Sequence, residues 1–378
     1  MWIWQEADWP NFTWQSDVLA PLLREVHFNQ GLLLGRMSHQ SKDEALNTTL
    51  DTLLANIIHS SAIEGEKLNA FSVRSSLANK LGVSESEPYA RSEQSDSLAD
   101  LMLDALPSST ESLKAPLSLK RILHWHRLLF SGDAGQSYLS NDILVGQLRG
   151  ESPMQVISYQ KRGRIDRPTL HFEAPARERL EADLTYFIDW FNQSLLDESL
   201  DPVLRAGITH LWFVTLHPMD DGNGRLTRLL TDLALAQGES QSIRLYAMSV
   251  SILENRQSYY DVLESVQKGQ LDITDWLVWF LQTLNQSLLN TLADIEQTLS
   301  KTRYWQSFDQ TQLSKEQSKV LNRLLDGDFE LGINSGQYQK VAKVSRATAT
   351  RHLAHLMELG CLVKTGAGGR STRYKLNL

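Results

Sequence analysis

The stretch LHPMDDGNGRLTRLL, residues 216–230, constrains the fold more than any other part of the sequence. Proline disfavours helical geometry in the residue before it, so a helix leading into this stretch should stop at or just before His217. Gly222 and Gly224 permit positive φ and a close approach of the backbone to a ligand. Asp221 stands where the cap of a new helix is expected. The stretch therefore predicts a helix, a tight loop and a second helix.

The side chains of this loop favour phosphate chemistry. Free N–H groups at the start of the second helix, together with the glycine turn, make a nest suited to an anion. Arg225 and Arg228 lie three residues apart and share a helix face, so they can reach the same anion. Asp221 can hold Mg²⁺ beside phosphate oxygens, and His217 is a candidate general base. Residue by residue, a capped helix–loop–helix with two solvated arginines explains the pattern, but so many coinciding residue types favour a Mg²⁺-dependent phosphate site.

The same residues resemble the motif of the Fic family, His-x-Phe-x-Asp/Glu-Gly-Asn-Gly-Arg-x-x-Arg. The matching positions are His217, Asp221, Gly222, Asn223, Gly224, Arg225 and Arg228. Met219 departs from the motif at an apolar anchor of the family, and methionine should fill that pocket with some loss of rigidity. No Walker-type GxxxxGKS/T loop occurs in the sequence, so that route to an ATP site is absent.

The resemblance implies transfer of a nucleoside monophosphate, usually AMP from ATP, to a hydroxyl side chain of a target protein. In that scheme His217 deprotonates the target hydroxyl and Asp221 holds Mg²⁺. The remaining motif residues bind phosphates: Asn223 with the Gly222 and Gly224 amides at the α- and β-phosphates, Arg225 and Arg228 at the β- and γ-phosphates. Such a scheme agrees with phosphoryl transfer in general, where positioning and charge neutralisation supply most of the catalysis.

Residues 146–172 mix β-forming residues with glycine, proline and arginine, and predict an irregular hairpin. The part near 150–172 falls where Fic proteins place a flap that docks the target by strand addition. Basic residues can favour an acidic target there, although a solvated loop explains them equally well; they are Arg149, Lys161, Arg162, Arg164 and Arg167. The stretch ENRQSYYDVL resembles the family segment beside the adenine pocket, which makes Tyr259 and Tyr260 candidate nucleotide-binding residues. Core packing explains either tyrosine alone about as well.

A second informative stretch is SSAIEGEKL, residues 60–68. The preceding helix should end near Gly65, a suitable left-handed cap. Glu64 would then lie in the last turn, where the helix dipole disfavours an acid by a few tenths to about 1 kcal/mol. A nearby cation would compensate; otherwise Glu64 is a partly exposed glutamate tolerated at small cost.

The stretch also resembles the Fic inhibitory motif, Ser/Thr-x-x-x-Glu-Gly/Asn, at Ser60, Glu64 and Gly65. In the family this glutamate pairs with the second motif arginine, here Arg228, and denies it to the γ-phosphate. Inhibition would then act within the chain, by a motif N-terminal to the catalytic one. Some Fic enzymes use the same glutamate to remove AMP from a modified target, and the sequence does not separate the two directions.

Composition bounds the class of protein. The 378 residues are enough for two or three domains. A content of 42% hydrophobic and 22% charged residues is typical of a globular chain, with no apolar run long enough for a membrane span. The N-terminus lacks the basic region and apolar core of a signal peptide, and the single cysteine, Cys361, excludes an intrachain disulfide framework and a cysteine-based zinc cluster. A cytoplasmic protein is the simplest interpretation.

The C-terminal tail differs in charge from the rest. Residues 336–378 carry eight basic residues against one acid, a local charge of +7 in a chain of −8, which leaves −15 elsewhere. We expect a helix at about 337–342, then a second one capped by Ser345 and ended by Gly360, then two strands around a glycine-rich wing. Cys361 should be a small buried residue at the start of the first strand.

The tail resembles the helix-turn-helix regulators often fused to bacterial Fic cores. Its expected DNA-recognition face consists of Arg346, Thr348, Thr350 and Arg351, with phosphate contacts from Arg370, Arg373 and Lys375. The alternative is a module that binds protein or packs on the core, with its charge merely solvating it.

Helical periodicity dominates the chain. Helices are expected at 16–39, 42–62, 69–82, 90–105, 117–130, 176–196, 202–216, 222–237, 249–267 and 273–300. The expected fold class is mostly α: a Fic-type helical core with a β-hairpin flap, plus a small C-terminal winged-helix domain. The expected domains are a Trp-rich helical segment at 1–40, a catalytic core at 41–300 with its inhibitory helix at about 42–65 and flap at about 150–172, a linker and helix at 301–335, and the winged helix at 336–378. Trp2, Trp4, Trp9 and Trp14 should pack on neighbouring helices, and a polar stretch near 301–314 should be the linker.

These observations predict a protein adenylyltransferase, a nucleotidyltransferase with ATP as substrate and Mg²⁺ as its metal, inhibited in cis by Glu64 pairing with Arg228. Expected partners are a protein target with a Ser, Thr or Tyr hydroxyl docked on the flap, DNA at 346–375 and a second copy in a homodimer, but no membrane. Two alternatives stay open: AMP removal by Glu64, and a DNA-binding regulator that senses nucleotide without turnover. The intact His217 and Asp221 argue against the regulator, because a sensor needs phosphate ligands but no base.

Overall fold

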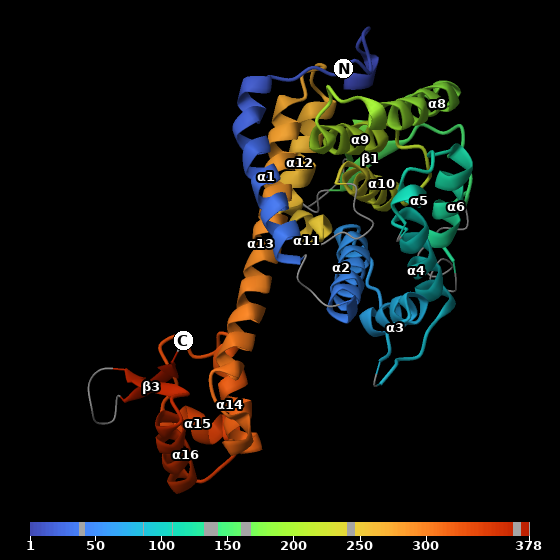
Figure 1. Ribbon diagram of the computed structural model, residues 1–378. Coiled ribbons are helices and arrows are strands. Elements are labelled where there is room, and N and C mark those ends of the chain that lie inside the picture. Colours follow the sequence, from blue (N-terminus) through green and yellow to red (C-terminus); the bar gives the residue numbers. More distant parts are fainter. Residues whose placement is uncertain are drawn as a thin grey trace. The chain divides into compact units, whose positions relative to one another are not determined.

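The computed structural model describes residues 1–37, 42–85, 87–107, 109–131, 143–159, 168–239, 246–365 and 372–377. The chain divides into two compact units, Met1–Thr291 and Leu292–Leu378. In their described parts both are built mainly of helices, and each holds a two-stranded sheet (Figure 1). The mostly helical fold class predicted from the sequence is confirmed.

The first unit holds most of the helices. They are α1 (Ser16–Met37), α2 (Lys42–Ile63), α3 (Ala70–Leu81), α4 (Glu93–Ala105), α5 (Thr110–Leu113), α6 (Leu119–Leu129), α8 (Arg177–Gln193), α9 (Pro202–Leu216), α10 (Asn223–Gly238), α11 (Met248–Glu254), α12 (Arg256–Gln267) and the first part of α13 (Thr274–Gln306). Short 3₁₀ turns occur at η1 (Ile3–Gln5) and η2 (Ser194–Leu196). Strands β1 (Gln155–Tyr159) and β2 (Pro168–Glu173) pair antiparallel with a bulge between Val156 and Ile157, so the predicted hairpin is present.

Helix α9 forms the centre of this unit. Every residue from 203 to 216 is buried, including the polar Arg205, Thr209 and His210. Gly207 lets α13 lie close, because a Cβ there would come within 2.9 Å of Leu277. Trp276 Nε1 on α13 donates to Gly207 O at 2.8 Å. The residues that follow α9 are therefore held by a tightly packed element.

The N-terminal tryptophans pack against this unit. Trp4 Nε1 donates to Glu173 O in β2 at 2.7 Å, and Trp2 meets Phe172 edge-on with centroids 5.4 Å apart. Trp9 packs on Trp212 of α9 at 6.3 Å. The predicted packing role is confirmed for these three side chains, although two of them pack on a strand rather than a helix.

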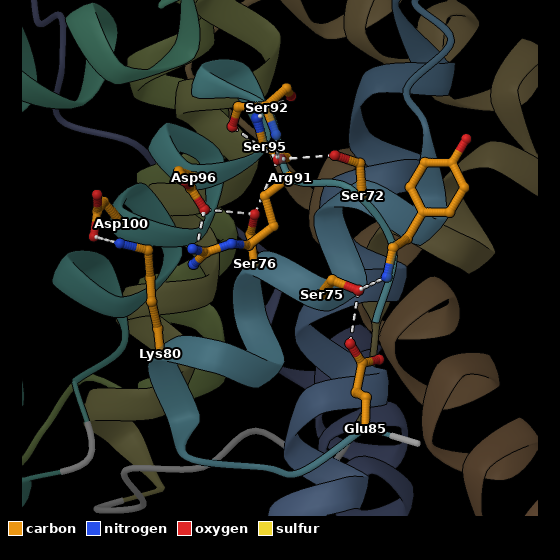
Figure 2. Close-up of polar contacts among 11 residues, drawn as sticks. Ser72, Ser75, Ser76, Lys80, Glu85, Arg91, Ser92, Ser95, Asp96 and Asp100 are labelled. Carbon is orange, nitrogen blue, oxygen red and sulfur yellow. Dashed lines mark hydrogen bonds and ion pairs between the residues drawn. The ribbon is translucent and has the colours of Figure 1, made fainter. Parts of the chain in front are cut away.

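Helices α3 and α4 meet through a buried serine cluster (Figure 2). Ser72 Oγ donates to Ser95 Oγ at 3.0 Å. Ser76 Oγ donates to the Asp96 carboxylate at 2.7 Å and lies 2.9 Å from Ser95 Oγ. Small side chains allow close approach, and each buried hydroxyl has a hydrogen-bond partner, which avoids the cost of an unpaired polar group. Arg74 on α3 forms an ion pair with Asp51 on α2. The serine cluster and this ion pair join α2, α3 and α4.

The second unit has its own core. It contains α14 (Lys315–Leu325), α15 (Ser335–Ala342), α16 (Arg346–Glu358) and the antiparallel strands β3 (Leu362–Thr365) and β4 (Arg373–Leu376). Ser345 accepts from Thr348 N and Gly360 has φ +74, so the expected helix boundaries hold. Cys361 is fully buried, as predicted. Arg370 lies outside the described residues.

Two predicted boundaries were wrong. The expected helix at 249–267 is divided into α11 and α12 at Asn255, which leaves helical geometry and donates its side-chain amide to Ser251 O at 3.0 Å. The polar stretch near 301–314 is not a simple linker, because α13 continues to Gln306 and a 3₁₀ turn, η3, spans Gln310–Gln312. The stretch is polar overall, so the sequence did not indicate that one face is apolar. Tyr304 on that face is buried in the core of the second unit.

None of the helices in the described ranges is both long and apolar enough to cross a membrane.

Candidate active site

His217 ends helix α9 in the left-handed conformation, with φ +47, directly before Pro218. Its ring Nδ1 lies 3.1 Å from Val214 O. A carbonyl only accepts, so Nδ1 carries the proton and Nε2 keeps its lone pair. Burial is the main cause that lowers the pKa of His217, and the nearby Arg149 lowers it further. The imidazole is therefore neutral at physiological pH and can accept a proton through Nε2.

Arg149 holds the backbone around His217. Its Nε donates to His217 O at 2.9 Å, its Nη2 to Pro175 O at 2.5 Å, and its own N–H to Pro218 O at 2.9 Å. The side chain is buried, so the predicted part of Arg149 in attracting an acidic target is wrong. The other four basic residues of that prediction, Lys161, Arg162, Arg164 and Arg167, lie outside the described residues.

The loop after His217 is fixed from within. Met219 is fully buried, so methionine does fill the apolar position of the motif. Asn223 accepts from Met219 N at 2.9 Å through Oδ1 and donates to Met219 O at 2.8 Å through Nδ2. Both polar atoms of this side chain therefore bond to the Met219 peptide and fix the shape of the loop.

Helix α10 begins one residue later than the sequence suggested. Gly222 is its N-cap, with φ +78, which favours glycine. Asp221 does not cap the helix as predicted: its Oδ1 accepts only from Gly222 N, at 2.6 Å, because the carboxylate precedes the cap position. Asp221 is exposed. No acceptor within the described residues is bonded to the N–H groups of Asn223, Gly224 and Arg225, as expected at a helix start.

Arg228 is buried and faces helix α2. Its Nε donates to Ser60 Oγ at 2.8 Å, and Nη2 donates to Ser60 O at 2.9 Å and to Glu64 Oε1 at 2.7 Å. Glu64 stands just after the last residue of α2, and Gly65 has φ +84, the expected left-handed cap. Burial alone would raise the pKa of Glu64, but the charge and hydrogen bond of Arg228 outweigh it and lower that pKa. The carboxylate is therefore ionised in this contact.

The carboxylate of Glu64 also lies against the first turn of α10. A Cβ at Gly224 would stand 2.1 Å from Glu64 Oε1. Glycine at this position thus admits an anion to the helix start, and the anion found there is the Glu64 side chain itself. Glu64 therefore forms an ion pair with Arg228 and also fills the space beside the unbonded N–H groups.

Arg225 pairs with a different acid. Its Nη1 donates to Glu66 Oε2 at 2.7 Å, and its guanidinium lies 4.8 Å from the ring centre of Phe130. Neither Glu66 nor Phe130 was predicted. Glu66 follows Glu64 by two residues in the sequence. Two acids this close, opposite two arginines, could have indicated two ion pairs, Glu64 with Arg228 and Glu66 with Arg225.

The two candidate tyrosines differ. Tyr259 is buried and its hydroxyl lies 2.9 Å from His210 Nε2, so it is part of the core. His210 Nδ1 lies 3.0 Å from Thr231 Oγ1, which in turn donates to Thr227 O. Tyr260 is 37% exposed, which leaves only this ring available to a nucleotide base.

A further residue outside the motif contacts the loop. His126 on α6 is fully buried, with Nε2 3.0 Å from Asp221 O, and its Nδ1 accepts from Gly146 N at 2.8 Å. Nothing in the sequence singled out this residue, which is one of two histidines in LHWHRLLF.

One carboxylate of the loop, Asp221, is of the kind that would hold Mg²⁺ together with substrate phosphates. Within the described ranges, no group of three or more His, Cys, Asp or Glu side chains could hold a metal. Mg²⁺ commonly binds through one carboxylate plus substrate phosphates. Asp221 fits that pattern, because it is exposed, adjoins the unbonded N–H groups, and has Oδ2 without a partner among the described residues.

Family models match two segments of the chain. Residues 116–235 match the Fic/DOC family, and residues 2–83 match a domain of unknown function, DUF4172. The chain therefore contains a Fic/DOC family domain, and residues 217–228 lie inside it. Glu64 belongs to the other matched segment, so the Glu64–Arg228 contact joins the two.

Curated relatives carry consistent names. The chain is 24% identical over 301 residues to "Protein adenylyltransferase Fic" of Drosophila willistoni, covering 78% of this chain and 53% of the relative. It is 26% identical over 265 residues to "Protein adenylyltransferase fic-1" of Caenorhabditis elegans, covering 68% and 44%. The chain thus spans about half the length of these relatives.

Solved structures show the same fold. A Fic family protein from Desulfovibrio desulfuricans G20 superposes with a TM-score of 0.51 at 17% identity, over 97% of this chain and 98% of that one. Fic-1 from C. elegans gives 0.51 at 22% identity, over 75% and 74%.

Proposed function

We propose that the chain is a protein adenylyltransferase that transfers AMP from ATP to a hydroxyl group of a target protein and is inhibited by its own Glu64. The observation that carries the proposal is the position of the Glu64 carboxylate, an anion 2.7 Å from Arg228 Nη2 at the start of α10. A helix start with unbonded N–H groups and a buried arginine binds anions. The names of the curated relatives support the reaction.

The chemistry follows from the groups present. The target O–H gives its proton to His217 Nε2, its oxygen bonds to the α-phosphorus of ATP, and the bond to the β-phosphate breaks with release of pyrophosphate. Arg228, Arg225 and the N–H groups at the start of α10 would neutralise phosphate charge. Asp221 would hold Mg²⁺, which supplies further charge neutralisation when bound.

Inhibition follows from competition for Arg228. A hydrogen bond between charged groups contributes about 1.5–3 kcal/mol, and each 1.4 kcal/mol corresponds to about tenfold in rate. The Glu64 side chain is 33% exposed, which favours the lower part of that range. Loss of Glu64 should thus raise activity by roughly tenfold.

The target would dock on the β1–β2 hairpin. Val156 and Ile157 are exposed on β1, and strand addition needs only backbone hydrogen bonds from such an edge. On β2, His171 Nδ1 lies 2.6 Å from Glu264 Oε2 of α12, which fixes the hairpin to the unit that carries the site.

The test compares wild type, Glu64→Gly and Glu64→Gly/His217→Ala, each with Mg²⁺ and α-labelled ATP. Label should appear on protein strongly in the single variant and vanish in the double variant. No label in any of the three, with ATP binding measurable, would contradict the proposal and favour AMP removal or nucleotide sensing. Incubation with a labelled, AMP-modified target then separates these two.

We also propose that the second unit is a winged helix that binds DNA through α16. Arg346, Thr350 and Arg351 are exposed on this helix, and Lys375 is exposed on β4. Arg373 is less available, because its Nη1 donates to Gly332 O at 2.8 Å. Weaker duplex binding by the full chain in Arg346→Ala/Arg351→Ala, with a smaller dependence of the affinity on salt, would support this. Unchanged binding, or no binding by the wild type, would contradict it.

A further inference from the structure

Residues 143–150, here called the bracing segment, lie against the loop that carries the motif. Asp220 accepts from the segment at both ends, through Oδ2 from Leu144 N at 3.0 Å and through Oδ1 from Gly150 N at 3.3 Å. Arg149 donates to His217 O at 2.9 Å. The segment thus holds the first half of the motif loop, at His217 and Asp220.

His126 joins the bracing segment to the second half of the loop. Gly146 N donates to His126 Nδ1 at 2.8 Å, and an N–H group only donates, so Nδ1 carries the lone pair. The proton is then on Nε2, which donates to Asp221 O at 3.0 Å. The ring cannot turn over without losing both bonds.

Side-chain packing also restricts the His126 ring. Its centroid lies 4.9 Å from that of Phe130, edge to face, and its Cδ2 would be 3.6 Å from a Cβ on Gly222. A fully buried ring with one donor, one acceptor and an aromatic neighbour is held in one position. The imidazole therefore keeps a constant distance between Gly146 N and Asp221 O.

The hydrogen bond from His126 to Asp221 O determines the orientation of the Asp221–Gly222 peptide. The unit between Asp221 and Gly222 is planar and trans, so its carbonyl and its N–H point in opposite directions. With Asp221 O held on the His126 side, Gly222 N points the other way, where it donates to Asp221 Oδ1 at 2.6 Å. Gly222, with φ +78, would otherwise allow this peptide to rotate easily.

We propose that His126 is a positioning residue for nucleotide transfer, which sets the Asp221–Gly222 peptide and through it the Asp221 carboxylate and the start of α10. The proposal rests on the proposed function and adds a residue outside the motif. The ring touches no reacting atom; it acts by removing the freedom of a glycine-flanked peptide at the phosphate site.

The test uses the full chain in the Glu64→Gly background, with His126 changed to Gln, Asn or Phe. Gln can place an amide N–H near the position of Nε2 and still donate to Asp221 O. Asn is too short to reach that carbonyl but can accept from Gly146 N. Phe keeps the ring packing and loses both hydrogen bonds. His124→Asn is the matched control, because His124 is an exposed histidine on the same helix.

The measurements are kcat, KM for ATP, the half-saturating Mg²⁺ concentration, and ATP binding by calorimetry. For Asn and Phe we expect kcat to fall about tenfold or more and ATP affinity to fall with it, because the part-buried Asp221 carbonyl loses the donor that fixes its peptide. The half-saturating Mg²⁺ concentration should also rise for these two. Gln should stay within about threefold of the parent, since one hydrogen bond is regained. His124→Asn should match the parent.

A purely structural role would give a different order. Phe would then match or exceed Gln, and any loss would follow the unfolding midpoint. Equal impairment of Gln and Phe, or parental activity in all three, overturns the proposal. If Phe fails to fold, the comparison of Gln with Asn decides, because both are polar and of similar size. A parent without labelling contradicts the proposed function, while the order of ATP affinities still tests His126.

Discussion

His217, the base of the proposed reaction, is held in one tautomer by a carbonyl of its own helix. His217 Nδ1 is bonded to Val214 O at 3.1 Å, so only Nε2 faces the reaction. Burial lowers the pKa of this imidazole from its ordinary 6.5. Glu64 acts in the opposite direction, so its removal lowers the pKa of His217 further. In the free protein the base is therefore mostly deprotonated at pH 6.5 and above.

We predict that kcat/KM of the Glu64→Gly variant is constant across neutral pH and declines only below pH 6.5. This parameter reports ionisation of the free enzyme, and protonated His217 cannot accept the target proton. Initial rates of labelling between pH 5 and about 9 measure it, with the folded fraction followed at each pH. An acidic limb above pH 7 would mean that another group is the base.

His210 provides a second pH effect, on stability rather than on rate. It lies between Tyr259 and Thr231 in the core, and burial lowers its pKa to about 3. Above pH 6.5 both the folded and the unfolded states hold it neutral. Below that pH the unfolded state takes up a proton that the folded state refuses, so the free energy of unfolding falls as the pH falls towards 3.

We predict that His210→Gln flattens this decline. The single residue contributes at most about 1.4 kcal/mol per pH unit below its unfolded pKa. Denaturant unfolding of both proteins at several pH values from about 7 to 5 gives the two slopes. Gln can accept from the Tyr259 hydroxyl but has no pKa in this range. Parallel slopes would show that His210 is protonated in the folded state.

Single residues of the motif could be predicted from the sequence, because their spacing is local. The sequence also indicated the Ser60–Glu64 pattern, although its partner Arg228 lies 164 residues after Glu64 in the sequence. It did not indicate that Asn223 bonds to Met219 or that Arg149 is buried. Such partners depend on how distant segments meet, and a basic residue near a hairpin has the same local pattern whether it is buried or solvated.

Among the elements, α9 decides how firmly the site is held. It is packed on all sides, and its approach to α13 depends on the missing side chain of Gly207. A Cβ there would lie 2.9 Å from Leu277 Cδ2 and 3.1 Å from Phe280 Cδ1, closer than ordinary contacts. Both neighbours are buried, so they have little room to move.

We predict that Gly207→Ala lowers the free energy of unfolding by about 1–3 kcal/mol, the usual range for overpacking a core. Chemical denaturation measures it. Gly31→Ala is the matched control: this glycine is exposed in α1 and a Cβ there meets nothing within 4 Å. The control should be neutral or more stable by up to about 1 kcal/mol, since alanine favours helix. Equal effects of the two changes would contradict close packing of α9 on α13.

The positions of most helices could be predicted because apolar periodicity and caps are local signals. The break at Asn255 and the extension of α13 to Gln306 could not. Asn255 breaks the helix while its side-chain amide donates to Ser251 O, but in the sequence it looks like any polar surface residue. Tyr304 is buried only because the folded second unit provides a core around it, which the local sequence does not show.

At the scale of the whole chain, two units share one continuous helix. The boundary between Thr291 and Leu292 falls inside α13, ahead of the predicted boundary at 300. The second unit nevertheless has a core of its own, with Leu321, Ile333, Leu353 and Leu356 almost fully buried. The proposed catalytic residues all belong to the first unit. Folding of the second unit should therefore be separable from activity.

We predict that Leu353→Ala destabilises the second unit alone. Leu353 is 1% exposed, and truncating a buried leucine to alanine costs about 2–5 kcal/mol. Calorimetry of the full chain should show one transition shifted to lower temperature and the other unchanged. Labelling by Glu64→Gly should be the same with and without Leu353→Ala, below the shifted transition. Leu331→Ala is the control, because Leu331 is 71% exposed. If both transitions move together, or labelling is lost, α13 couples the units and the second unit takes part in catalysis.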